Sequence, residues 1–340
     1  MDPVPQTTRD RPPTIRDVAR SAKVGVGTVS RVLNDSPLVS DVARERVRRA
    51  IEELGYRPSS TARKLSLGRT QTIGVVAPFF TTGSVLERLR GVVERLREGY
   101  DYDLLLFDVE TIAQRRDAFR DFARSDRVDG LLLMSLRPSD EEVESLRDER
   151  LPVVLIDVGH PAFPSVVIDD VQGGEMATQH LLDKGHRRIG FVGDIPTPFG
   201  FTSSEHRRRG MRRALRRAGV EHDARLEQRG PHGREEAREL AERLLDLPEA
   251  PSAIFAASDV QAMGVLEAAR ARSLRVPEDL AVIGFDDIEV AGALELTTIR
   301  QPLRETGRRG ADLLLAAVEG VDAAPTEELA ALTLIERRTT

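Results

Sequence analysis

Residues 14–58 alternate apolar and polar positions with the period of an α-helix. Three short segments each gather their apolar side chains on one face, with a turn at 21–25 between the first two. Thr14 and Asp17 have the spacing of a capping box, and Ser40 is a good N-cap. Gly55 stands where a left-handed residue ends a helix. The pattern predicts three helices, arranged as a helix-turn-helix followed by a third helix.

From residue 72 onward, short apolar runs alternate with longer amphipathic segments. The runs predict strands at 73–77, 103–107, 130–134, 153–157, 189–193, 253–257 and 281–285. The segments between them predict helices at 84–98, 113–124, 140–149, 173–184, 206–218, 234–246, 259–272 and 304–319. Such alternation is typical of parallel sheets covered by helices on both faces. Because the length exceeds one doubly wound domain, we expect an α/β body of two lobes.

Charge divides the chain between the same two regions. Residues 1–70 hold 14 Lys and Arg against 8 Asp and Glu, whereas the remainder holds 36 against 48. A basic head on an acidic body suits a protein that presents one end to a polyanion. Arginine is abundant throughout, so charge alone would not decide, but a basic segment that is also a helix-turn-helix favours DNA.

Several classes of protein lack support in the sequence. Cysteine is absent, which excludes disulfides and thiolate metal sites, and the six His residues show no metal-binding spacing. No apolar run reaches membrane-spanning length and no signal-peptide pattern is present, so we expect a cytoplasmic protein with no membrane segment. Dinucleotide-binding, P-loop, nucleophile-elbow and metalloprotease motifs are missing. We therefore expect no enzyme and no cofactor.

Four runs of sequence point to a known family. IRDVAR, TVSRVLN, the VS at 39–40 and AIEELGYRP are the runs concerned, and together they resemble the headpiece of the lactose-repressor (LacI/GalR) family of bacterial transcription regulators. The resemblance continues to about residue 338. With the polar, Pro-rich start, it implies a disordered tail at 1–13, a headpiece at 14–58, a hinge helix at 59–70 and an effector-binding body at 71–340.

The resemblance also implies how the body is built. Two lobes of periplasmic-binding-protein type are expected, an N-lobe at about 72–169 and 300–330 and a C-lobe at about 170–299 and 331–340. No long heptad pattern follows residue 320, so the tetramerisation helix of some relatives is not expected. These features favour a homodimer that binds a pseudo-palindromic operator in double-stranded DNA.

DNA contacts are expected from the recognition helix and the hinge. Val26 and Gly27 open that helix without a side-chain hydrogen bond, which leaves polar contacts to Arg31 and its neighbours. Gly25 stands where the family usually has Ser. In the family, the hinge residue matched by Leu65 enters the minor groove and kinks the DNA; core packing for Val26 and an anchor against the body for Leu65 are the alternatives. The expected DNA-binding residues are Thr14, Arg16, Val26, Gly27, Thr28, Ser30, Arg31, Asn34, Ser59, Ala62, Arg63, Lys64 and Leu65.

Effector contacts are expected at the carboxyl ends of the strands, where doubly wound sheets bind ligands. By the resemblance, Arg207 and Asp286 match ligand-binding residues, and Ser258 departs from a common Asn beside an Asp. Each has a structural alternative: a solvated helix start for Arg207, a cap for Asp286 or Asp157, and core packing for Phe79. The expected effector-binding residues are Phe79, Phe80, Thr81, Ser135, Asp157, Phe199, Arg207, Ser258, Asp259, Asp286 and Gln301.

The resulting prediction is a ligand-responsive transcription regulator, a repressor whose hinge couples effector binding to DNA binding. A sugar or sugar derivative is the favoured effector. A purine, a nucleoside or a phosphorylated sugar stays open, and the arginines at 207–209 mildly favour an anion. Response to a phosphorylated carrier protein is a further alternative, and a solute-binding protein for transport is a remote one.

Overall fold

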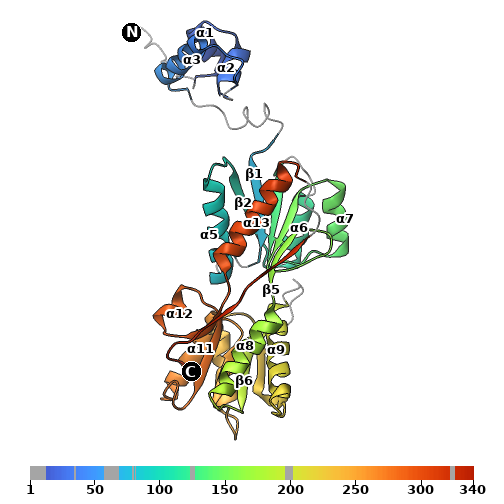
Figure 1. Ribbon diagram of the computed structural model, residues 1–340, viewed down its shortest axis with the longest axis vertical. Coiled ribbons are helices and arrows are strands. Elements are labelled where there is room, and N and C mark those ends of the chain that lie inside the picture. Colours follow the sequence, from blue (N-terminus) through green and yellow to red (C-terminus); the bar gives the residue numbers. More distant parts are fainter. Residues whose placement is uncertain are drawn as a thin grey trace, which may run out of the picture. The chain divides into compact units, whose positions relative to one another are not determined.

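The computed structural model describes residues 13–33, 36–56, 69–78, 80, 82–122, 127–195, 202–321 and 326–340. The chain divides into two compact units, a headpiece up to Thr70 and a body from Gln71 onward (Figure 1). Among the described helices, none combines the length and the apolar character needed to cross a lipid bilayer.

Three helices form the headpiece, as the hydrophobic period predicts. They are α1 (Ile15–Ala22), α2 (Val26–Leu33) and α3 (Asp41–Leu54). The capping box is present, since the Thr14 hydroxyl donates to Asp17 at 2.6 Å. Ser40 accepts a bond from the Ala43 amide at 3.4 Å, and Gly55 ends α3 with φ 58°. The turn is shorter than expected because α1 continues to Ala22. Side chains from all three helices close a small core.

The N-lobe is a parallel sheet of six strands in the order β11-β5-β4-β3-β1-β2. Its strands are β1 (Thr72–Ala77), β2 (Asp103–Asp108), β3 (Gly130–Met134), β4 (Val153–Ile156), β5 (Ser165–Ile168) and β11 (Glu327–Ala330). Its helices are α5 (Gly83–Arg97), α6 (Ile112–Phe122), α7 (Asp140–Asp148) and α13 (Leu303–Val318). Separate apolar clusters fill the two faces, one under α5 and α13 and the other under α6 and α7.

The C-lobe repeats this plan in the order β12-β10-β9-β8-β6-β7, with only β12 antiparallel to its neighbour. Its strands are β6 (Ile189–Asp194), β7 (Glu227–Gly230), β8 (Ala253–Ala256), β9 (Ala281–Asp286), β10 (Thr297–Arg300) and β12 (Thr333–Ile335). Its helices are α8 (Asp170–Asp183), α9 (Ser203–Arg217), α10 (Arg234–Leu245), α11 (Asp259–Ala271) and the short α12 (Glu289–Ala293), with the 3₁₀ turn η1 (Ala224–Leu226). Helices α8 and α9 cover one face, α10 and α11 the other.

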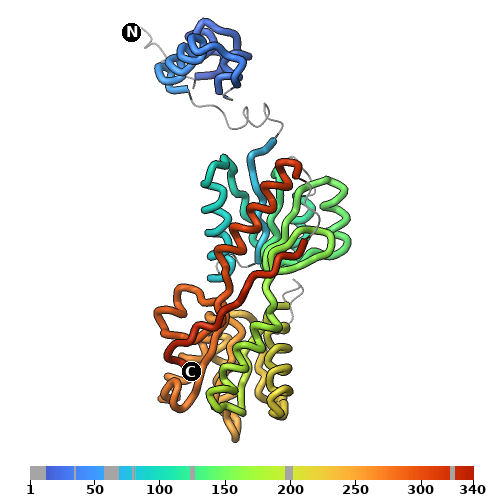
Figure 2. The backbone as a smooth tube through the Cα atoms, in the orientation of Figure 1, coloured from blue at the N-terminus to red at the C-terminus, as the bar shows by residue number. Residues whose placement is uncertain are grey.

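The chain passes between the two sheets three times, from β5 into α8, from β10 into α13 and from β11 into β12 (Figure 2). Each lobe is therefore assembled from separate stretches of sequence. The carboxyl ends of the parallel strands of both lobes, and the residues that follow them, meet at this junction.

All seven predicted strands form, and the predicted parallel α/β architecture is confirmed. Five strands were not predicted, namely β5, β7, β10, β11 and β12, because each has only three or four residues and most carry polar side chains. Helices α8 and α9 begin three residues before their predicted starts at 173 and 206. In α8 the earlier start follows from Asp169, which caps the helix by accepting from the Gln172 amide at 2.9 Å.

Candidate functional site

The outer surface of α2 carries the residues expected to meet DNA. Val26 is 43% exposed, so the core-packing alternative for it is wrong. A Cβ at Gly27 would have no atom within 4 Å, which leaves open space beside the start of the helix. Arg16 and Arg31 are exposed, while Val29 and Val32 face the core. Of the other expected contacts, Thr28 and Ser30 are half-buried on α2, and Thr14 serves the capping box of α1.

Several expected site residues lie outside the described part of the chain. On the DNA side these are Asn34, Ser59, Ala62, Arg63, Lys64 and Leu65. On the effector side they are Phe79, Thr81 and Phe199. Their roles stay predictions from the sequence.

In the N-lobe, a glycine-mediated helix crossing holds Arg88 in place. A Cβ added at Gly91 of α5 would lie 2.0 Å from the Arg304 carbonyl oxygen of α13, and one at Gly307 would lie 2.0 Å from the Arg88 carbonyl oxygen. Only glycine allows the two backbones to approach so closely. Arg88 is thereby fixed at the end of the lobe nearest the junction, and it is 1% exposed.

Arg88 belongs to a polar group that the sequence analysis did not predict as a unit. Its guanidinium donates to one oxygen of Asp157 and, at 2.8 Å, to the side-chain oxygen of Gln301. The other oxygen of Asp157 accepts from the Ser135 hydroxyl at 2.7 Å. In the described part of the chain, Arg88 Nε is the one buried side-chain nitrogen or oxygen atom without a hydrogen-bond partner.

In the C-lobe, a second glycine crossing holds Arg207. A Cβ at Gly174 of α8 would lie 2.0 Å from the Arg207 carbonyl oxygen, and one at Gly210 of α9 would lie 2.1 Å from the Val171 carbonyl oxygen. Arg207 is buried, and therefore the alternative of a solvated helix start is wrong for it. The crossing accounts for Gly174, whereas Gly173 faces the Phe285 ring, where a Cβ would lie 2.6 Å from a ring carbon.

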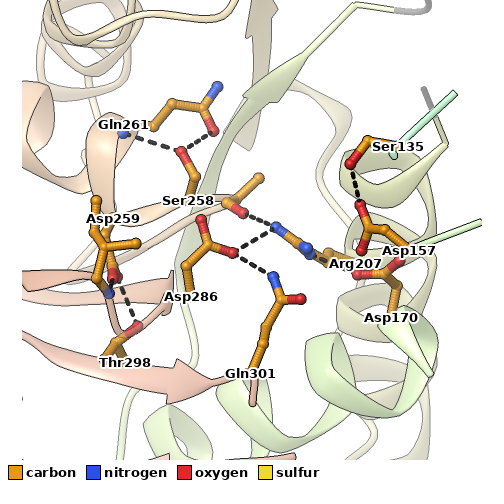
Figure 3. A network of polar contacts seen from close by, with 12 residues as sticks. Ser135, Asp157, Asp170, Arg207, Ser258, Asp259, Gln261, Asp286, Thr298 and Gln301 are labelled. Carbon is orange, nitrogen blue, oxygen red and sulfur yellow. Dashed lines mark hydrogen bonds and ion pairs between the residues drawn. The ribbon is translucent and has the colours of Figure 1, made fainter. Parts of the chain in front are cut away.

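Arg207 is bound on several sides (Figure 3). Its Nε donates to Asp170 at 2.8 Å, one terminal nitrogen donates to the Ala257 carbonyl at 2.6 Å, and the same nitrogen lies 3.7 Å from Asp286 Oδ1. The guanidinium carbon lies 3.7 Å from the centroid of the Phe285 ring, a cation–π contact. A buried cation thus meets two carboxylates, a carbonyl and an aromatic face.

Gln301 joins the two groups across the junction. Its side-chain oxygen accepts from Arg88 of the N-lobe. Its side-chain nitrogen donates to Asp286 of the C-lobe (Figure 3). The lobes also touch at Gly83, where a Cβ would lie 2.8 Å from Ile288 Cδ1. The network is therefore continuous from α5 through Gln301 to the end of β9.

Burial raises the pKa of Asp286 to about 6, and the charges of Arg207 and Arg88 only partly oppose that rise. Burial likewise raises the pKa of Asp170, against the charge of Arg207. The junction therefore holds more carboxyl groups than its two guanidinium groups can neutralise. Perturbed carboxyl groups of this kind are frequent at functional sites.

Backbone strain is concentrated at the same strand ends. Positive φ angles occur at Ser135 (52°), Asp157 (75°), Asp286 (115°) and Asp287 (57°), at or directly after the ends of β3, β4 and β9. Non-glycine residues adopt such angles at a cost of about 1–3 kcal/mol each, and they persist where the surroundings enforce them. The strain marks the junction as a site whose polar groups are held in place.

Two expected effector residues serve the C-lobe itself. Both oxygens of Asp259 are occupied, one by the Thr298 hydroxyl at 2.6 Å and the other by the Ile288 amide at 2.9 Å. Ser258 caps α11 by accepting from the Gln261 amide at 3.2 Å. Both side chains are buried, and the structure thus gives them roles in holding α11 against β9 and β10. Phe80, the remaining expected residue, is half-buried against the N-lobe core.

Two further groups were not among the expected effector residues. Arg88 could have been found from the spacing Val85, Arg88, Val92 and Leu96, which places an arginine in the buried stripe of a helix. The second group is Asp194 at the end of β6, which accepts from His232 at 3.1 Å and from Gln261 at 2.9 Å.

Two family models match the chain. The model for bacterial regulatory proteins, lacI family, matches residues 14–59, and the periplasmic binding protein-like domain matches residues 178–340. The HTH-type transcriptional repressor CytR of Escherichia coli (strain K12) is 36% identical over 312 residues, 90% of each protein. The ribose operon repressor of the same strain is 38% identical over 309 residues, 89% of this chain and 92% of the repressor.

Solved structures share both parts of the molecule. The transcriptional regulator CelR in complex with cellobiose has 34% identity and a TM-score of 0.72, and the match covers 96% of this chain and 100% of CelR. The lac repressor dimer bound to operator and the anti-inducer ONPF has 27% identity and a TM-score of 0.84, over 97% of this chain and 99% of the repressor. Headpiece and body therefore occur together in these proteins as they do here.

Proposed function

The chain belongs to the lacI family of bacterial regulatory proteins, and from that membership we propose that it is a dimeric repressor released from or held on its operator by a neutral polyhydroxylated ligand. The observation that supports the ligand part of the proposal is the buried network Arg88–Gln301–Asp286. In this network the side chain of Gln301 connects the two lobes. A ligand that replaces any of these hydrogen bonds shifts the balance between lobe arrangements.

The DNA-binding part rests on the headpiece. Its three helices match the family model, α2 leaves Val26 and Arg31 on the surface, and the first 70 residues are basic. A lac repressor structure of the same architecture holds operator DNA. We propose that α2 enters the major groove and that the residues after Tyr56 reach the minor groove. The protein would then act on the bacterial chromosome, in the cytoplasm.

The dimer contact is proposed along β2, an edge strand of the N-lobe sheet. Leu106 on β2 is 47% exposed, and Leu86 of α5 and Ile112 of α6 are 41% and 62% exposed. Large apolar side chains on and beside a sheet edge mark a surface that pairs with another chain. A second copy of this chain fits, because the relative with bound operator is a dimer.

The charges at the junction favour a neutral ligand. Arg88 is paired with Asp157, and Arg207 with Asp170 and Asp286. Arg208, which the sequence grouped with Arg207, is paired instead with Glu205 and Glu227. The charge of each buried guanidinium is already compensated by a carboxylate, so the weak preference for an anion drawn from the sequence loses its basis. A ligand rich in hydroxyl groups satisfies both donors and acceptors, and one structural relative contains cellobiose.

Selection of binding sites from random duplex DNA by the full-length, ligand-free protein tests the regulator. Enrichment of one pseudo-palindrome supports it, and random sequences after repeated rounds, with and without added metabolites, would refute it. Leu106→Arg should abolish binding to that site because it separates the dimer. Leu329→Arg is the matched control, since Leu329 is 65% exposed on β11, the opposite edge of the same sheet.

A further inference from the structure

The two lobes carry the same short motif at the same kind of helix crossing. In α5 the motif is Arg88-Leu-Arg-Gly91, and in α9 it is Arg207-Arg-Arg-Gly210. In both cases the glycine three residues after the arginine lies against the neighbouring helix, and the arginine carbonyl lies against a glycine of that helix. The same backbone device therefore presents one buried guanidinium from each lobe.

Each guanidinium meets a strained aspartate at the end of a strand. Arg88 donates to Asp157 after β4, which has φ 75°, and Arg207 lies beside Asp286 at the end of β9, which has φ 115°. Gln301 links the two halves. The junction is thus walled by two matched arginine–aspartate pairs, one per lobe, although only Arg207 was expected from the sequence.

The two pairs differ in how completely they are satisfied. Arg207 has Asp170, Asp286, the Ala257 carbonyl and the Phe285 ring around it. Arg88 has Nε left without a hydrogen-bond partner among the described residues, although the side chain is buried. Native structures pair almost all buried donors, and an exception calls for an explanation by function or by a missing partner molecule.

We infer that Arg88 is a specificity-determining ligand contact on the N-lobe wall of this site. Its Nε–H donates to an acceptor oxygen of the ligand, while Asp157 beside it accepts a hydrogen bond from a neighbouring hydroxyl group. Two adjacent oxygens of one ligand, such as a vicinal diol, satisfy both at once. The inference rests on the proposed function, and it assigns one end of the neutral ligand to a named residue.

If packing were the only role of the side chain at position 88, burying a charged arginine there would cost free energy that an apolar side chain would not. The stripe Val85, Val92 and Leu96 around it is apolar, and a leucine would continue that stripe. Replacing a buried ion pair by apolar residues is often neutral or stabilising. The pair Arg88–Asp157 is therefore better explained by what it binds than by what it adds to folding.

The experiment measures ligand binding to the full-length dimer by calorimetry, using a library of neutral pentoses, hexoses, disaccharides and nucleosides together with their phosphorylated counterparts. We expect at least one neutral compound to bind and its phosphorylated counterpart to bind about tenfold more weakly or worse. Arg88→Leu should lower the affinity for that neutral compound about tenfold or more, since a hydrogen bond from a charged donor is lost.

A series of monodeoxy analogues separates a ligand contact from a structural role. Wild type should lose affinity for the analogue that lacks the oxygen bound by Arg88, whereas Arg88→Leu should bind this analogue and the parent compound equally. Arg90→Leu is the control on the same helix, with an exposed side chain, and should behave as wild type. If Arg88→Leu does not fold, the double variant Arg88→Leu/Asp157→Asn removes both charges and takes its place.

Three outcomes overturn the inference. Wild-type affinity in Arg88→Leu, equal discrimination among deoxy analogues in both proteins, and preference for the phosphorylated compounds each contradict it. Binding of the operator by a wild-type protein that binds no neutral compound in the library also overturns the inference, while the regulator itself stands. Failure to select any operator refutes the proposed function instead.

Discussion

The two lobes share one architecture, but they differ in how completely their buried arginine is hydrogen-bonded. Each has a six-stranded sheet, helices on both faces, a helix crossing closed by glycines and one buried arginine at the junction. In the C-lobe, Arg207 is enclosed by two carboxylates, a carbonyl and a ring. In the N-lobe, Arg88 has one carboxylate and an amide, and Nε is left over.

The difference shows that one fold can supply a C-lobe side whose polar groups are already held in place and an N-lobe side that still has a donor for a ligand. On the C-lobe side, the hydrogen bonds and contacts of Arg207 are all supplied by residues of the same lobe, and so its position is preorganised before any ligand arrives. On the N-lobe side, Arg88 Nε has no hydrogen-bond partner among the described residues, and a ligand supplies that partner. Binding energy is therefore available for drawing the N-lobe toward the C-lobe, with Gln301 as the shared residue.

The largest expected effect comes from removing each arginine in turn. Arg207→Leu leaves Asp170 and Asp286 buried without their cation, and it should destabilise the protein by about 3–5 kcal/mol. Arg88→Leu leaves only Asp157, which keeps its bond from Ser135, and should cost clearly less. Urea unfolding of both full-length variants, followed by circular dichroism, measures the two values. Equal losses would remove the distinction between the lobes.

Alanine at the glycine crossings tests what the lobes share. Gly91→Ala and Gly174→Ala each place a Cβ 2.0 Å from a backbone oxygen, so the helices must separate in both lobes. We expect a loss of about 1–3 kcal/mol in each case, together with weaker ligand binding. Gly292→Ala is the control, because its Cβ meets nothing within 4 Å, and it should be close to neutral. A loss of stability in only one of the two variants would mean that the glycine crossings do not have the same role in the two lobes.

The pH dependence of stability isolates the C-lobe carboxyl group. Burial raises the pKa of Asp286 from 3.8 to about 6, so the proton binds the folded state more tightly than the unfolded state. Its stabilising contribution is fully present below pH 3.8 and is lost as the pH rises through about 6. Asp286→Asn mimics the protonated group. The difference in unfolding free energy between variant and wild type should therefore grow from about pH 4 to about pH 7, and a constant difference would contradict the assignment.

The smallest effect concerns strain in the N-lobe. Ser135 has φ 52° and donates to Asp157. Ser135→Ala loses the hydrogen bond and keeps the strain, whereas Ser135→Gly loses the bond and relieves the strain. We expect the glycine variant to be more stable than the alanine variant by about 1 kcal/mol, measured by thermal unfolding. Identical stabilities would mean that the backbone at this strand end is not strained.

The sequence predicts the architecture well because the central strands are runs of five mostly apolar residues and the longer helices are amphipathic. Short strands escape prediction, as β7 with Glu-Gln-Arg-Gly illustrates, since their pairing depends on partners distant in sequence. The site is less predictable. Arg207 was expected from a family motif, but Arg88 was not, because an arginine in an amphipathic helix suggests the surface. Asp259 was expected at the ligand, and its hydrogen bond from Thr298 is a contact that only the tertiary fold shows.

The three passages of chain between the sheets also set an order of assembly during synthesis. β1 to β5 leave the ribosome first, but α13, which packs on α5, and β11, which pairs with β5, come only after the whole stretch from α8 to β10. The N-lobe must therefore wait until most of the C-lobe has been synthesised, and β12, the last strand, then completes the C-lobe sheet. Because long-range pairing of this kind is slow and leaves apolar faces uncovered, the headpiece can fold well before the body can respond to any ligand. A nascent or truncated chain would then hold a folded headpiece before the dimer contact along β2 and the ligand site are complete.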